Sequence, residues 1–587
     1  MLKTPALSLF LMVMISIPLS SSSSTTSGAV FTDQEKWSWS YTEVLSDNSD
    51  LDSGNVDLKV DDRGNIHVVW WDQHDVPRTG DLYSDIIYRR WDISTQSWND
   101  QEIAYSTNGN TLGLDPKVLI DKVGYVHVIW LDDSNYMDVG TDADIFYIMR
   151  DELTGVWGEV EVVTRESANT GYSADPHFAV DGNNDIHVVW WDTTSNLANS
   201  GTDSDIFYRK RFSQNNSWST MRVISDTSNE SSSSPQIAID GEGTIHFVWD
   251  DYTSNFGGND VDIVYRKYIP ELDFWSGITV VSIESTSNSQ EPSLITDMDS
   301  NIHVAWHDST DIFNSGPDWD VFYRRYDKLL ERWEDTTLVS EGFDSWSVLP
   351  RLAIDQHNNP SIAWTQWEYG DNGGLGDNDI LYRVYDGTLD SWSSLYVISA
   401  ESSGLSTSPA IYIDRSGFVH VAWVDDTIYQ SSGADNDIFY KKLHGLPAVP
   451  TLEAISPNPS TTGIIQLYWN EVYGVINYSI YRNQTPVTSI SELDPIATVT
   501  ENQFIDHINT TEQHFYYAVV AENYDGLSQI SNSEYVQVLF LPGNFGTNAT
   551  DGFPNQTAFF DGSLTVTVTS IVMFLAVSAF RRRRIRR

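Results

Sequence analysis

The stretch IHVVWWD at residues 186–192 decides the fold, because close copies of it recur along the chain. The other copies are IHVVWWD at Ile66, VHVIWLD at Val126, IHFVWDD at Ile245, IHVAWHD at Ile302, PSIAWTQ at Pro360 and VHVAWVD at Val419. The tryptophans of successive copies are separated by 60, 60, 59, 57, 58 and 59 residues. Such a constant period indicates a repeat architecture, in which every copy builds the same structural unit.

Each unit divides into four short segments with the pattern of β-strands. In the third copy these are SADPHFAVD, NDIHVVWWD, DSDIFYRKR and NSWSTMRVIS, which alternate apolar and polar residues and are bounded by Gly, Asn, Asp and Ser. No helical periodicity competes with this pattern. Four strands per repeat are typical of the blade of a β-propeller, although a solenoid remains the alternative at this point.

The two ends of the repeat region decide between these architectures. The seventh copy supplies a third strand at residues 435–443, but the fourth segment is missing after it. Residues 37–46, WSWSYTEVLS, match the missing segment and precede the first copy. The N-terminal strand is therefore expected to complete the last blade, which a solenoid would not need. The sequence predicts an all-β chain with a seven-bladed β-propeller over residues 30–445.

Composition limits the classes of function. The chain has 587 residues, 33 Lys and Arg against 83 Asp and Glu, a formal net charge of −50 and no cysteine. A disulfide-stapled fold is excluded, and the 13% aromatic content excludes a largely disordered chain. The acidity argues against nucleic acid and anionic membrane surfaces as partners, and leaves cations or basic partners open.

The two termini predict an exported protein of the cell membrane. Residues 1–29 have the layout of a signal peptide, with an apolar run followed by small residues. Residues 563–580 are predicted to form a single membrane-spanning helix, and the arginines of residues 581–587 place its end in the cytoplasm. A peripheral anchor or a sorting tail is the alternative. Residues 541–562, rich in Gly, Asn and Thr, are predicted to be a flexible stalk.

Two further features agree with export. Sequons begin at Asn215, Asn229, Asn477, Asn483, Asn509, Asn548 and Asn555, as in a glycosylated surface protein. Export without any cysteine favours a prokaryotic, archaeal-type cell-surface protein over an animal ectodomain.

Residues 446–540 resemble a fibronectin type III domain. The segments that carry the resemblance are LYW at Leu467, YSIYR at Tyr478, FID at Phe504, YYAVVAEN at Tyr516 and GLSQIS at Gly526. Trp469 is expected to fill the core between two sheets. The resemblance implies a spacer or an adhesive module.

The repeat region resembles the sialidase-like propellers with Asp boxes, in a degenerate form. The resemblance rests on DIFYRKR with NSW in the third copy and on DILYRVYDGTLDSW at residues 379–392. It implies an arginine cluster, a Tyr/Glu nucleophile pair and an acidic proton donor. Arg78, Arg351 and Arg415 lie on blades far apart in sequence without a matching motif. No catalytic residue is therefore assigned.

The repeated histidines are interpreted as packing residues that make a local hydrogen bond. They are His67, His127, His187, His246, His303 and His420. A shared metal would need its ligands within about 2.1 Å, whereas equivalent positions on packed sheets lie about 10 Å apart.

The repeated acidic loop between the second and third strands is a candidate for Ca²⁺, which takes oxygen ligands. No other cofactor is expected. The alternative is that these aspartates cap turns, or pair with a basic residue such as Arg209. The carboxylates assigned to calcium are Asp132, Asp142, Asp144, Asp192, Asp203, Asp205, Asp251, Asp260 and Asp262.

A ligand site should break the symmetry of the repeat. On the innermost strand, the residue after the repeated proline differs from copy to copy and is expected to line the channel, together with loop residues that have no counterpart in other copies. The predicted binding surface comprises Asp57, Lys117, His177, Gln236, Ser293, Arg351, His74, Arg78, Trp346, Trp367 and Glu368. Free drift of unconstrained positions is the alternative.

These observations favour a membrane-anchored cell-surface binding or adhesion protein whose propeller recognises a glycan or a surface protein. The first alternative is an extracellular glycoside hydrolase of the sialidase-like kind, or a polysaccharide lyase. The second is a structural component of the cell envelope. Clustered aromatic and carboxylate groups on one unrepeated face would favour glycan binding, and uniform loops would favour structure.

Overall fold

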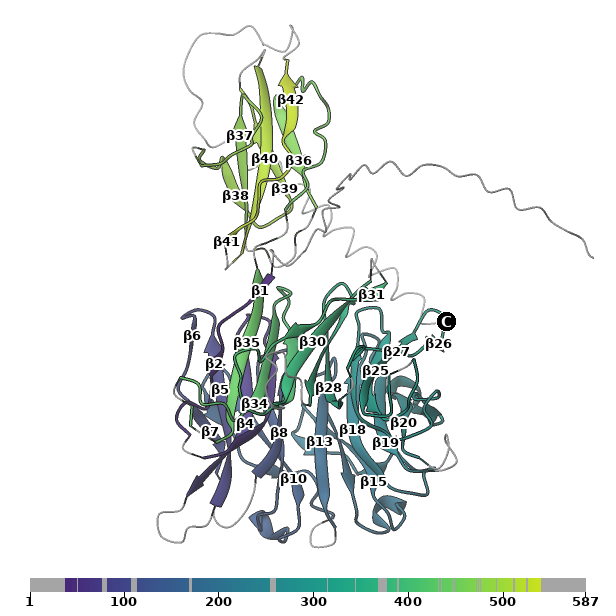
Figure 1. Ribbon diagram of the computed structural model, residues 1–587. Helices are drawn as coiled ribbons and strands as arrows, with labels where there is room; N and C mark the ends of the chain where they lie inside the picture. The colour runs from purple at the N-terminus through teal and green to yellow at the C-terminus, as the bar shows by residue number, and fades with distance from the viewer. Residues whose placement is uncertain are drawn as a thin grey trace, which may run out of the picture. The chain divides into compact units, whose positions relative to one another are not determined.

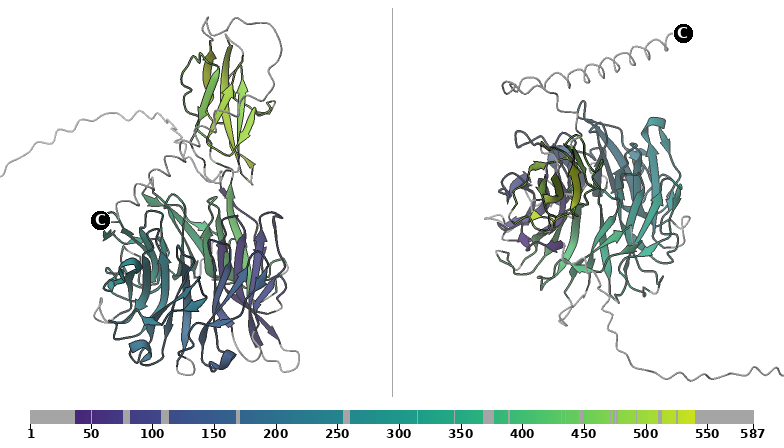
Figure 2. Two further views of the ribbon diagram at one scale, coloured as in Figure 1. Left: turned by 180° about the vertical axis from the view of Figure 1, so that it is seen from behind. Right: turned by 90° about the horizontal axis from the view of Figure 1, so that it is seen from above.

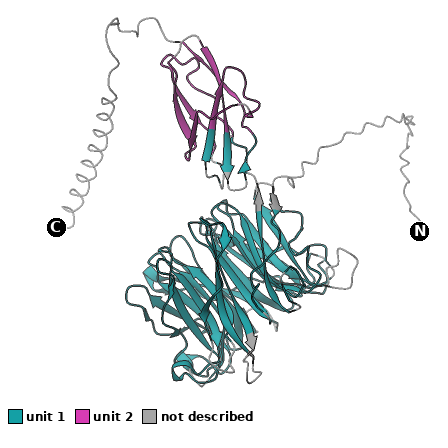
Figure 3. Cartoon of the chain, turned by 90° about the vertical axis from the view of Figure 1, so that its left-hand side faces the viewer, with its two compact units in different colours: residues 1–450, 471–479, 520–529 teal, residues 451–470, 480–519, 530–587 magenta. Residues whose placement is uncertain are grey.

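The computed structural model describes residues 37–539, apart from 50, 76–81, 107–112, 168–170, 254–259, 314, 344, 368–376, 388–389, 431, 434, 446, 448, 471, 473–474, 476, 492, 510–512 and 524–525. The predicted signal peptide, stalk, membrane helix and basic tail lie outside these residues. The chain divides into two compact units, residues 1–450 with 471–479 and 520–529, and residues 451–470, 480–519 and 530–587 (Figure 3).

The first unit contains seven antiparallel sheets of one design (Figure 1). Three long strands follow one another across each sheet, and the outermost strand is split into two short pieces. In blades one to three the strands are β3 (Ser53–Val60), β4 (Ile66–Asp75), β5 (Leu82–Asp92), β6 (Ser97–Trp98) and β7 (Glu102–Tyr105); β8 (Gly113–Ile120), β9 (Val126–Asp132), β10 (Asp144–Asp151), β11 (Val156–Trp157) and β12 (Glu161–Val162); and β13 (Ser173–Val180), β14 (Ile186–Asp192), β15 (Asp205–Phe212), β16 (Ser217–Trp218) and β17 (Arg222–Val223).

The next three blades repeat this order. Their strands are β18 (Ser232–Ile239), β19 (Ile245–Asp251), β20 (Asp262–Ile269), β21 (Phe274–Trp275) and β22 (Thr279–Val280); β23 (Ser289–Thr296), β24 (Ile302–Asp308), β25 (Asp320–Asp327), β26 (Arg332–Trp333) and β27 (Thr337–Leu338); and β28 (Ser347–Ile354), β29 (Pro360–Gln366), β30 (Asp379–Asp386), β31 (Ser391–Trp392) and β32 (Tyr396–Val397).

The seventh blade is built from both ends of the repeat region. Strands β33 (Ser406–Ile413), β34 (Val419–Asp425) and β35 (Asp437–Gly445) come from the last copy. The outer strand is supplied by β1 (Trp37–Trp39) and β2 (Glu43–Val44), which pair antiparallel with β35. The pairing joins the two segments that the sequence analysis assigned to one blade.

The first strand of each blade contacts the first strand of the next, and β33 contacts β3. The seven sheets therefore close into a ring with these strands at its centre, which is a seven-bladed β-propeller (Figure 2). The repeated tryptophan is fully buried in every blade, at Trp70, Trp130, Trp190, Trp249, Trp306, Trp364 and Trp423. Three short 3₁₀ turns, η2 (Tyr136–Asp138), η3 (Leu197–Asn199) and η4 (Pro270–Leu272), are the helical elements of the described residues. None of the helices in that part of the chain has the length and apolar character needed to cross a membrane.

A second contact repeats at all seven interfaces between blades. A tryptophan near the outer strand of each blade packs edge-on against a strand-three tyrosine of the preceding blade, with ring centroids 5.3 to 6.0 Å apart and interplanar angles of 70 to 88°. The pairs are Trp98–Tyr440, Trp157–Tyr88, Trp218–Tyr147, Trp275–Tyr208, Trp333–Tyr265, Trp392–Tyr323 and Trp39–Tyr382.

The repeated histidine holds this tyrosine in place. In blade three the Tyr208 hydroxyl lies 2.7 Å from His187 Nδ1, and His187 Nε2 lies 3.3 Å from Asp181 Oδ2. Burial lowers the pKa of His187, so its imidazole is neutral at pH 7. A carboxylate only accepts, so Nε2 carries the proton and Tyr208 donates to Nδ1. Five other blades repeat the histidine–tyrosine hydrogen bond with Nδ1–hydroxyl distances of 2.7 or 2.8 Å, and in three of them Nε2 lies 3.2 or 3.3 Å from the turn aspartate. The interpretation of the histidines as packing residues with a local hydrogen bond is confirmed.

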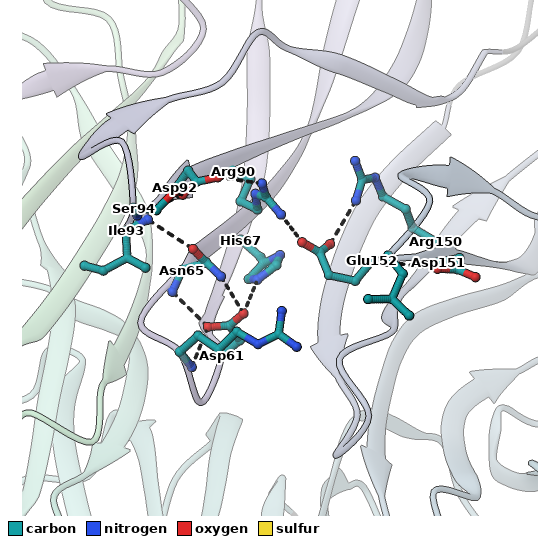
Figure 4. Close-up of polar contacts among 12 residues, drawn as sticks. Asp61, Asn65, His67, Arg90, Asp92, Ile93, Ser94, Arg150, Asp151 and Glu152 are labelled. Atoms are coloured by element: carbon teal, nitrogen blue, oxygen red, sulfur yellow. Dashed lines mark hydrogen bonds and ion pairs between the residues drawn. The ribbon is translucent and has the colours of Figure 1, made fainter.

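Ionic contacts reinforce the first interface. Figure 4 shows His67 beside Asp61 in blade one, and Glu152 of blade two between two arginines. Arg90 of blade one and Arg150 of blade two both bind the Glu152 carboxylate, the latter at 2.9 Å. Since Glu152 and Arg150 are largely buried, removing one partner would leave an uncompensated charge at the interface.

The C-terminal part of the described chain, residues 451–539, contains two sheets. Strand β36 (Ile464–Tyr468) pairs with β39 (Gln503–His507), and the other sheet has the order β38 (Ala497–Val499), β37 (Asn477–Asn483), β40 (Gln513–Asn523) and β41 (Gly526–Leu527), with β42 (Glu534–Val538) also on β40. Trp469 is buried, as the sequence predicts for a core residue, and residues 517–521 of β40 are completely buried. The fibronectin type III assignment stays a prediction.

The contribution of the tyrosine–histidine hydrogen bond to stability can be tested by comparing a blade that has the histidine with the blade that lacks it. Tyr208→Phe leaves a buried His187 Nδ1 without a donor, and we expect it to lower the free energy of unfolding by about 1–3 kcal/mol in chemical denaturation. Tyr382→Phe is the matched control. The Tyr382 hydroxyl bonds Ser361 Oγ at 3.0 Å, and a hydroxyl can rotate to another partner. Equal losses in the two variants would contradict the role given to histidine.

Candidate functional site

Every first strand carries a β-bulge near its start. The ladder to the second strand shifts register there, for example between Ala174 and His177 in blade three. The bulged residue has positive φ, from 46 to 55°, in all seven blades, at Asn55, Asp115, Asp175, Ser234, Glu291, Leu349 and Ser408. Bulges re-aim side chains and often lie beside functional sites. We call the end of the channel formed by these seven residues the bulge mouth, and the opposite end, at the turns between first and second strands, the turn mouth.

The predicted channel residues lie two positions beyond the bulge on the innermost strands. Three of them accept a backbone N–H from the next blade, namely Asp57 from Val118 at 2.9 Å, His177 from Ile237 at 3.3 Å and Ser293 from Leu352 at 3.0 Å. Gln236 and Arg351 are half-buried at the equivalent places. Asp57, His177 and Ser293 therefore link neighbouring blades, and a role of these positions in lining the channel stays a prediction.

The charges of these residues influence one another. Although burial opposes it, the ammonium groups of Lys59 and Lys117 hold the pKa of Asp57 below its usual value. Burial and the charge of Lys59 lower the pKa of His177 to about 3. His177 is thus a neutral hydrogen-bond acceptor at pH 7, and the channel residues Asp57, Lys117 and His177 belong to one electrostatic group.

A second variable position was missed by sequence reasoning. The residue after the repeated tryptophan is Trp71, Leu131, Trp191, Asp250, His307, Thr365 or Val424, and it lies opposite the residue before the bulge. Trp71 Nε1 donates to Asn55 at 2.8 Å and Trp191 Nε1 to Asp175 at 2.6 Å. The residue after the repeated tryptophan varies from copy to copy, just as the predicted channel residue does. This variation in the sequence could have identified the position.

Carboxylates gather on one part of the bulge mouth. Asp115, Asp175, Asp250 and Glu291 belong to blades two, three, four and five. Burial and the charges of Asp115 and Glu291 raise the pKa of Asp175 to about 7. Burial and the charge of Glu291 raise the pKa of Asp250 to about 8. The bulged residues of blades six, seven and one, by contrast, are Leu349, Ser408 and Asn55.

Aromatic side chains lie at the same ends of the strands as these carboxylates. Trp346 and Trp367 of blade six are 45% and 42% exposed, and their ring centroids are 5.0 Å apart. Tyr172 packs on Trp191 in blade three at 5.5 Å. Tyr252 of blade four accepts a hydrogen bond from the Gln290 amide at 3.3 Å. The structure thus brings the predicted Trp346 and Trp367 to one edge of the propeller. Arg78, Glu368 and the side chain of His74 lie outside what it describes.

The turn mouth has a different character. A cavity of about 730 Å³ lies there, lined by the turns of blades two to seven. Its aspartates are engaged in the turns themselves, as when Asp181 Oδ1 accepts the backbone N–H groups of Asn183 and Asp185 at 2.8 and 3.0 Å. The turn DGNND at Asp181 is thus held by hydrogen bonds to its own aspartate.

The calcium candidates are held by protein hydrogen bonds. Asp192 accepts Ser173 Oγ at 2.7 Å and the Thr194 N–H at 2.7 Å, and Asp251 accepts Trp249 Nε1 at 2.9 Å. Asp205 accepts Ser225 Oγ at 2.6 Å. Asp132, Asp144 and Asp262 make equivalent contacts, and Asp142, Asp203 and Asp260 are half-buried in the loops.

Within the described residues, no three or more His, Asp or Glu side chains are arranged so that they could hold a metal ion. Arg209 pairs with Glu166 at 2.8 Å, so the suggested pairing of Arg209 with the loop aspartates is not observed. Turn capping accounts for the observed contacts of the aspartates, and calcium binding stays a prediction.

Comparison with known proteins gives distant similarities. No family model matches the chain, and no curated protein matches it. A protein of unknown function from Dyadobacter fermentans is 12% identical over 58% of this chain and 96% of its own, with a TM-score of 0.39. An ulvan lyase of polysaccharide lyase family 25 is 13% identical over 66% and 94%, with a TM-score of 0.42. An intramolecular trans-sialidase from Ruminococcus gnavus is 10% identical over 67% and 94%, with a TM-score of 0.34. At these scores the similarities do not assign a function.

The buried loop carboxyls yield a test with a defined sign. Burial and neighbouring charges raise the pKa of Asp144 to about 7. The folded state keeps this proton up to about pH 7, whereas the unfolded chain loses it near pH 4, so ionisation costs stability as the pH rises from 4 to 7. Asp144→Asn removes that cost. We expect the melting temperature of Asp144→Asn, measured relative to the wild type, to be higher at pH 8 than at pH 5.

Asp61→Asn is the control of opposite sign. Although burial opposes it, the neighbouring His67 ring and the hydrogen bonds from Asn65 hold the pKa of Asp61 at about 2, so the ionised form stabilises the fold at both pH values. This variant should melt lower than the wild type at pH 5 and at pH 8. A difference between Asp144→Asn and wild type that does not change with pH would contradict the burial argument.

Proposed function

We propose that this protein binds a carbohydrate at the bulge mouth, as a recognition protein of the cell surface. The observation that carries the proposal is the unrepeated group of aromatic and carboxylate side chains on one edge of an otherwise repetitive propeller. A purely structural ring would have no need of different residues at equivalent positions of its blades.

The chemistry of the group suits a sugar. The C–H face of a pyranose packs on exposed aromatic rings, for which Trp346 and Trp367 are available. Its hydroxyl groups are donors that carboxylates accept, and Asp115 and Glu291 are half-buried at the mouth. A few polar groups beside apolar rings, held on strands of a rigid scaffold, are the usual composition of a small-ligand site.

Display at the cell surface is the second part of the proposal. It rests on the sequence of residues 1–29 and 563–580, which predict export and a single membrane helix. The two sheets of residues 451–539 would act as the spacer that the fibronectin type III resemblance implies.

A glycan-cleaving enzyme, either a glycoside hydrolase or a polysaccharide lyase, is the second candidate. The observation that favours it is the raised pKa of Asp175 and Asp250, about 7 and about 8, since a general acid must hold its proton near neutral pH. Asp250 is buried, however, which places its carboxyl out of direct reach of a substrate in this conformation. Carbohydrate binding without cleavage is therefore the first candidate function.

Binding is tested with a glycan array followed by titration calorimetry on the oligosaccharide that scores highest. We expect Trp346→Ala and Trp367→Ala each to weaken binding about tenfold, because each removes a stacking surface. Phe274→Ala removes an exposed aromatic ring from the outer strand β21 of blade four and is the control.

Incubating the same oligosaccharide with the protein separates the two candidates. An unchanged oligosaccharide supports recognition, and new reducing ends or unsaturated products support the enzyme. An array without any hit, or a loss with Phe274→Ala as large as with the tryptophan variants, would overturn the proposal.

A further inference from the structure

The hairpin of residues 213–216 in blade three carries a motif that the proposed binding site does not use. The hairpin joins β15 to β16 and, with Ser217 at the start of β16, contains the sequon Asn215–Asn216–Ser217. The hairpins at the same point of the other five blades that have one place a different residue at the position of Asn215, namely Thr95, Thr154, Leu272, Leu330 or Leu389. Blade three is thus the one copy of this hairpin with an asparagine there.

The shape of the hairpin is set by the repeat and not by the sequon. All six hairpins have four residues between the strands and positive φ at the last of them, which in blade three is Asn216 with φ 55°. Asparagine tolerates this conformation well. The Asn216 N–H donates to the Phe212 carbonyl at 2.9 Å, and Arg211 donates to Asn216 Oδ1 at 3.2 Å. These bonds hold the hairpin at Asn216 and leave Asn215 beside it at the tip.

The acceptor and the hydroxyl of this sequon are both accessible. Asn215 and Ser217 are exposed. The Ser217 hydroxyl donates to Asn215 Oδ1 at 2.8 Å, and the Ser217 N–H donates to the same oxygen at 3.2 Å. Both bonds use the carbonyl oxygen of the side chain, and Asn215 Nδ2 donates to no acceptor among the described residues. The nitrogen that would carry a glycan is therefore presented next to the hydroxyl that completes the motif.

The other sequons of the described chain are less accessible. Asn229 is exposed, but Ser231 is half-buried and its carbonyl accepts the Tyr252 N–H at 3.0 Å. Asn477 is the half-buried first residue of β37, and the hydroxyl residue of its sequon, Ser479, is only 8% exposed within that strand. The sequon at Asn483 begins at a half-buried residue. The three remaining sequons include residues outside the described part of the chain.

The hairpin lies at the turn-mouth end of the propeller. The Ser213 N–H donates to Asp185 Oδ1 at 2.8 Å, and Ser213 Oγ donates to the Asn183 carbonyl at 2.9 Å. Asp185 and Asn183 belong to the turn between β13 and β14. A glycan on Asn215 would therefore start at the end of the propeller opposite the bulge mouth and leave the proposed binding surface open.

We propose that Asn215 is an N-glycosylation site of the folded protein, which takes an oligosaccharide from a polyprenyl diphosphate donor. Asn215 Nδ2 attacks C1 of the first sugar. The N–C1 bond forms as the C1–O bond breaks, the electron pair of the broken bond leaves with the diphosphate, and the displaced amide proton passes to a base of the transferase. The inference rests on the export that the proposed function includes, because this modification belongs to the surface loops of exported chains.

The test uses the purified full-length chain, made without glycans, and a single-subunit oligosaccharyltransferase first shown to modify a synthetic peptide of residues 211–219. Mass spectrometry measures the occupancy of each sequon in the folded chain and in the same chain digested to peptides. We expect the folded-to-peptide ratio of occupancy to be at least about tenfold higher at Asn215 than at Asn477, because the strand that carries Asn477 must open locally before it is modified.

Two substitutions of Ser217 verify that the sequon directs the modification. Ser217→Ala removes the hydroxyl but keeps Asn215, so we expect no glycan on Asn215 in this variant. Ser217→Thr keeps the hydroxyl and should keep the modification. Since Ser217 is exposed, both variants should melt like the wild type, which a melting curve checks.

An unmodified Asn215 in the folded chain, equal ratios at Asn215 and Asn477, or a glycan on Asn215 in Ser217→Ala would overturn the inference. The transfer assay does not involve the bulge mouth, so its failure is distinguishable from a failure of the proposed function. A blank glycan array overturns carbohydrate binding even when Asn215 is modified, and an unmodified Asn215 beside a positive array overturns the inference alone.

Discussion

The propeller depends on one chain of contacts that is made again at nearly every interface: turn aspartate, histidine, tyrosine and the tryptophan of the next blade. The aspartate fixes the imidazole tautomer, the imidazole fixes the tyrosine hydroxyl, and the tyrosine ring receives the edge of the tryptophan from the following blade. Because each blade contributes the histidine to one interface and the tryptophan to the other, no blade is satisfied alone. The hydrogen bonds among aspartate, histidine and tyrosine form within one blade, and closure of the ring supplies each tyrosine ring with the tryptophan of the next blade.

This dependence explains where the chain is free to vary. The turn aspartates, the histidines and the third and outer strands are tied into the interfaces, and they repeat. The bulged residues and those that follow the repeated tryptophan lie toward the other end of the channel, and they vary among the blades. The frame of the ring is therefore uniform, but the charge of the bulge mouth is not. The mouth carries acidic residues at blades two to five and uncharged bulged residues at blades six, seven and one.

Much of the fold could be predicted from the sequence, because the fold-determining residues are the repeated ones. The IHVxW copies located the second strands, and the unmatched WSWSYTEVLS segment indicated how the ring closes. The site was less predictable. The channel position of Asp57, Lys117 and His177 followed from the repeat, but Asp250 and Glu291 did not. A bulge shifts the side chains around it, and sequence spacing alone does not show which residue it turns into the mouth. The pKa values of Asp61 and Asp144, about 2 and about 7, likewise differ because packing gives the two aspartates different neighbours. Sequence alone does not show these neighbours.

The central claim is that recognition takes place at the bulge mouth. Hydrogen–deuterium exchange of the full-length chain, with and without the oligosaccharide selected by the array, tests it most directly because the method reports every segment at once. The account predicts slower exchange in residues 172–177, 231–236, 289–293 and 345–351, with little change elsewhere. Protection confined to the turns at residues 181–184, 240–243 and 297–300, or to the two sheets of residues 451–539, would contradict it.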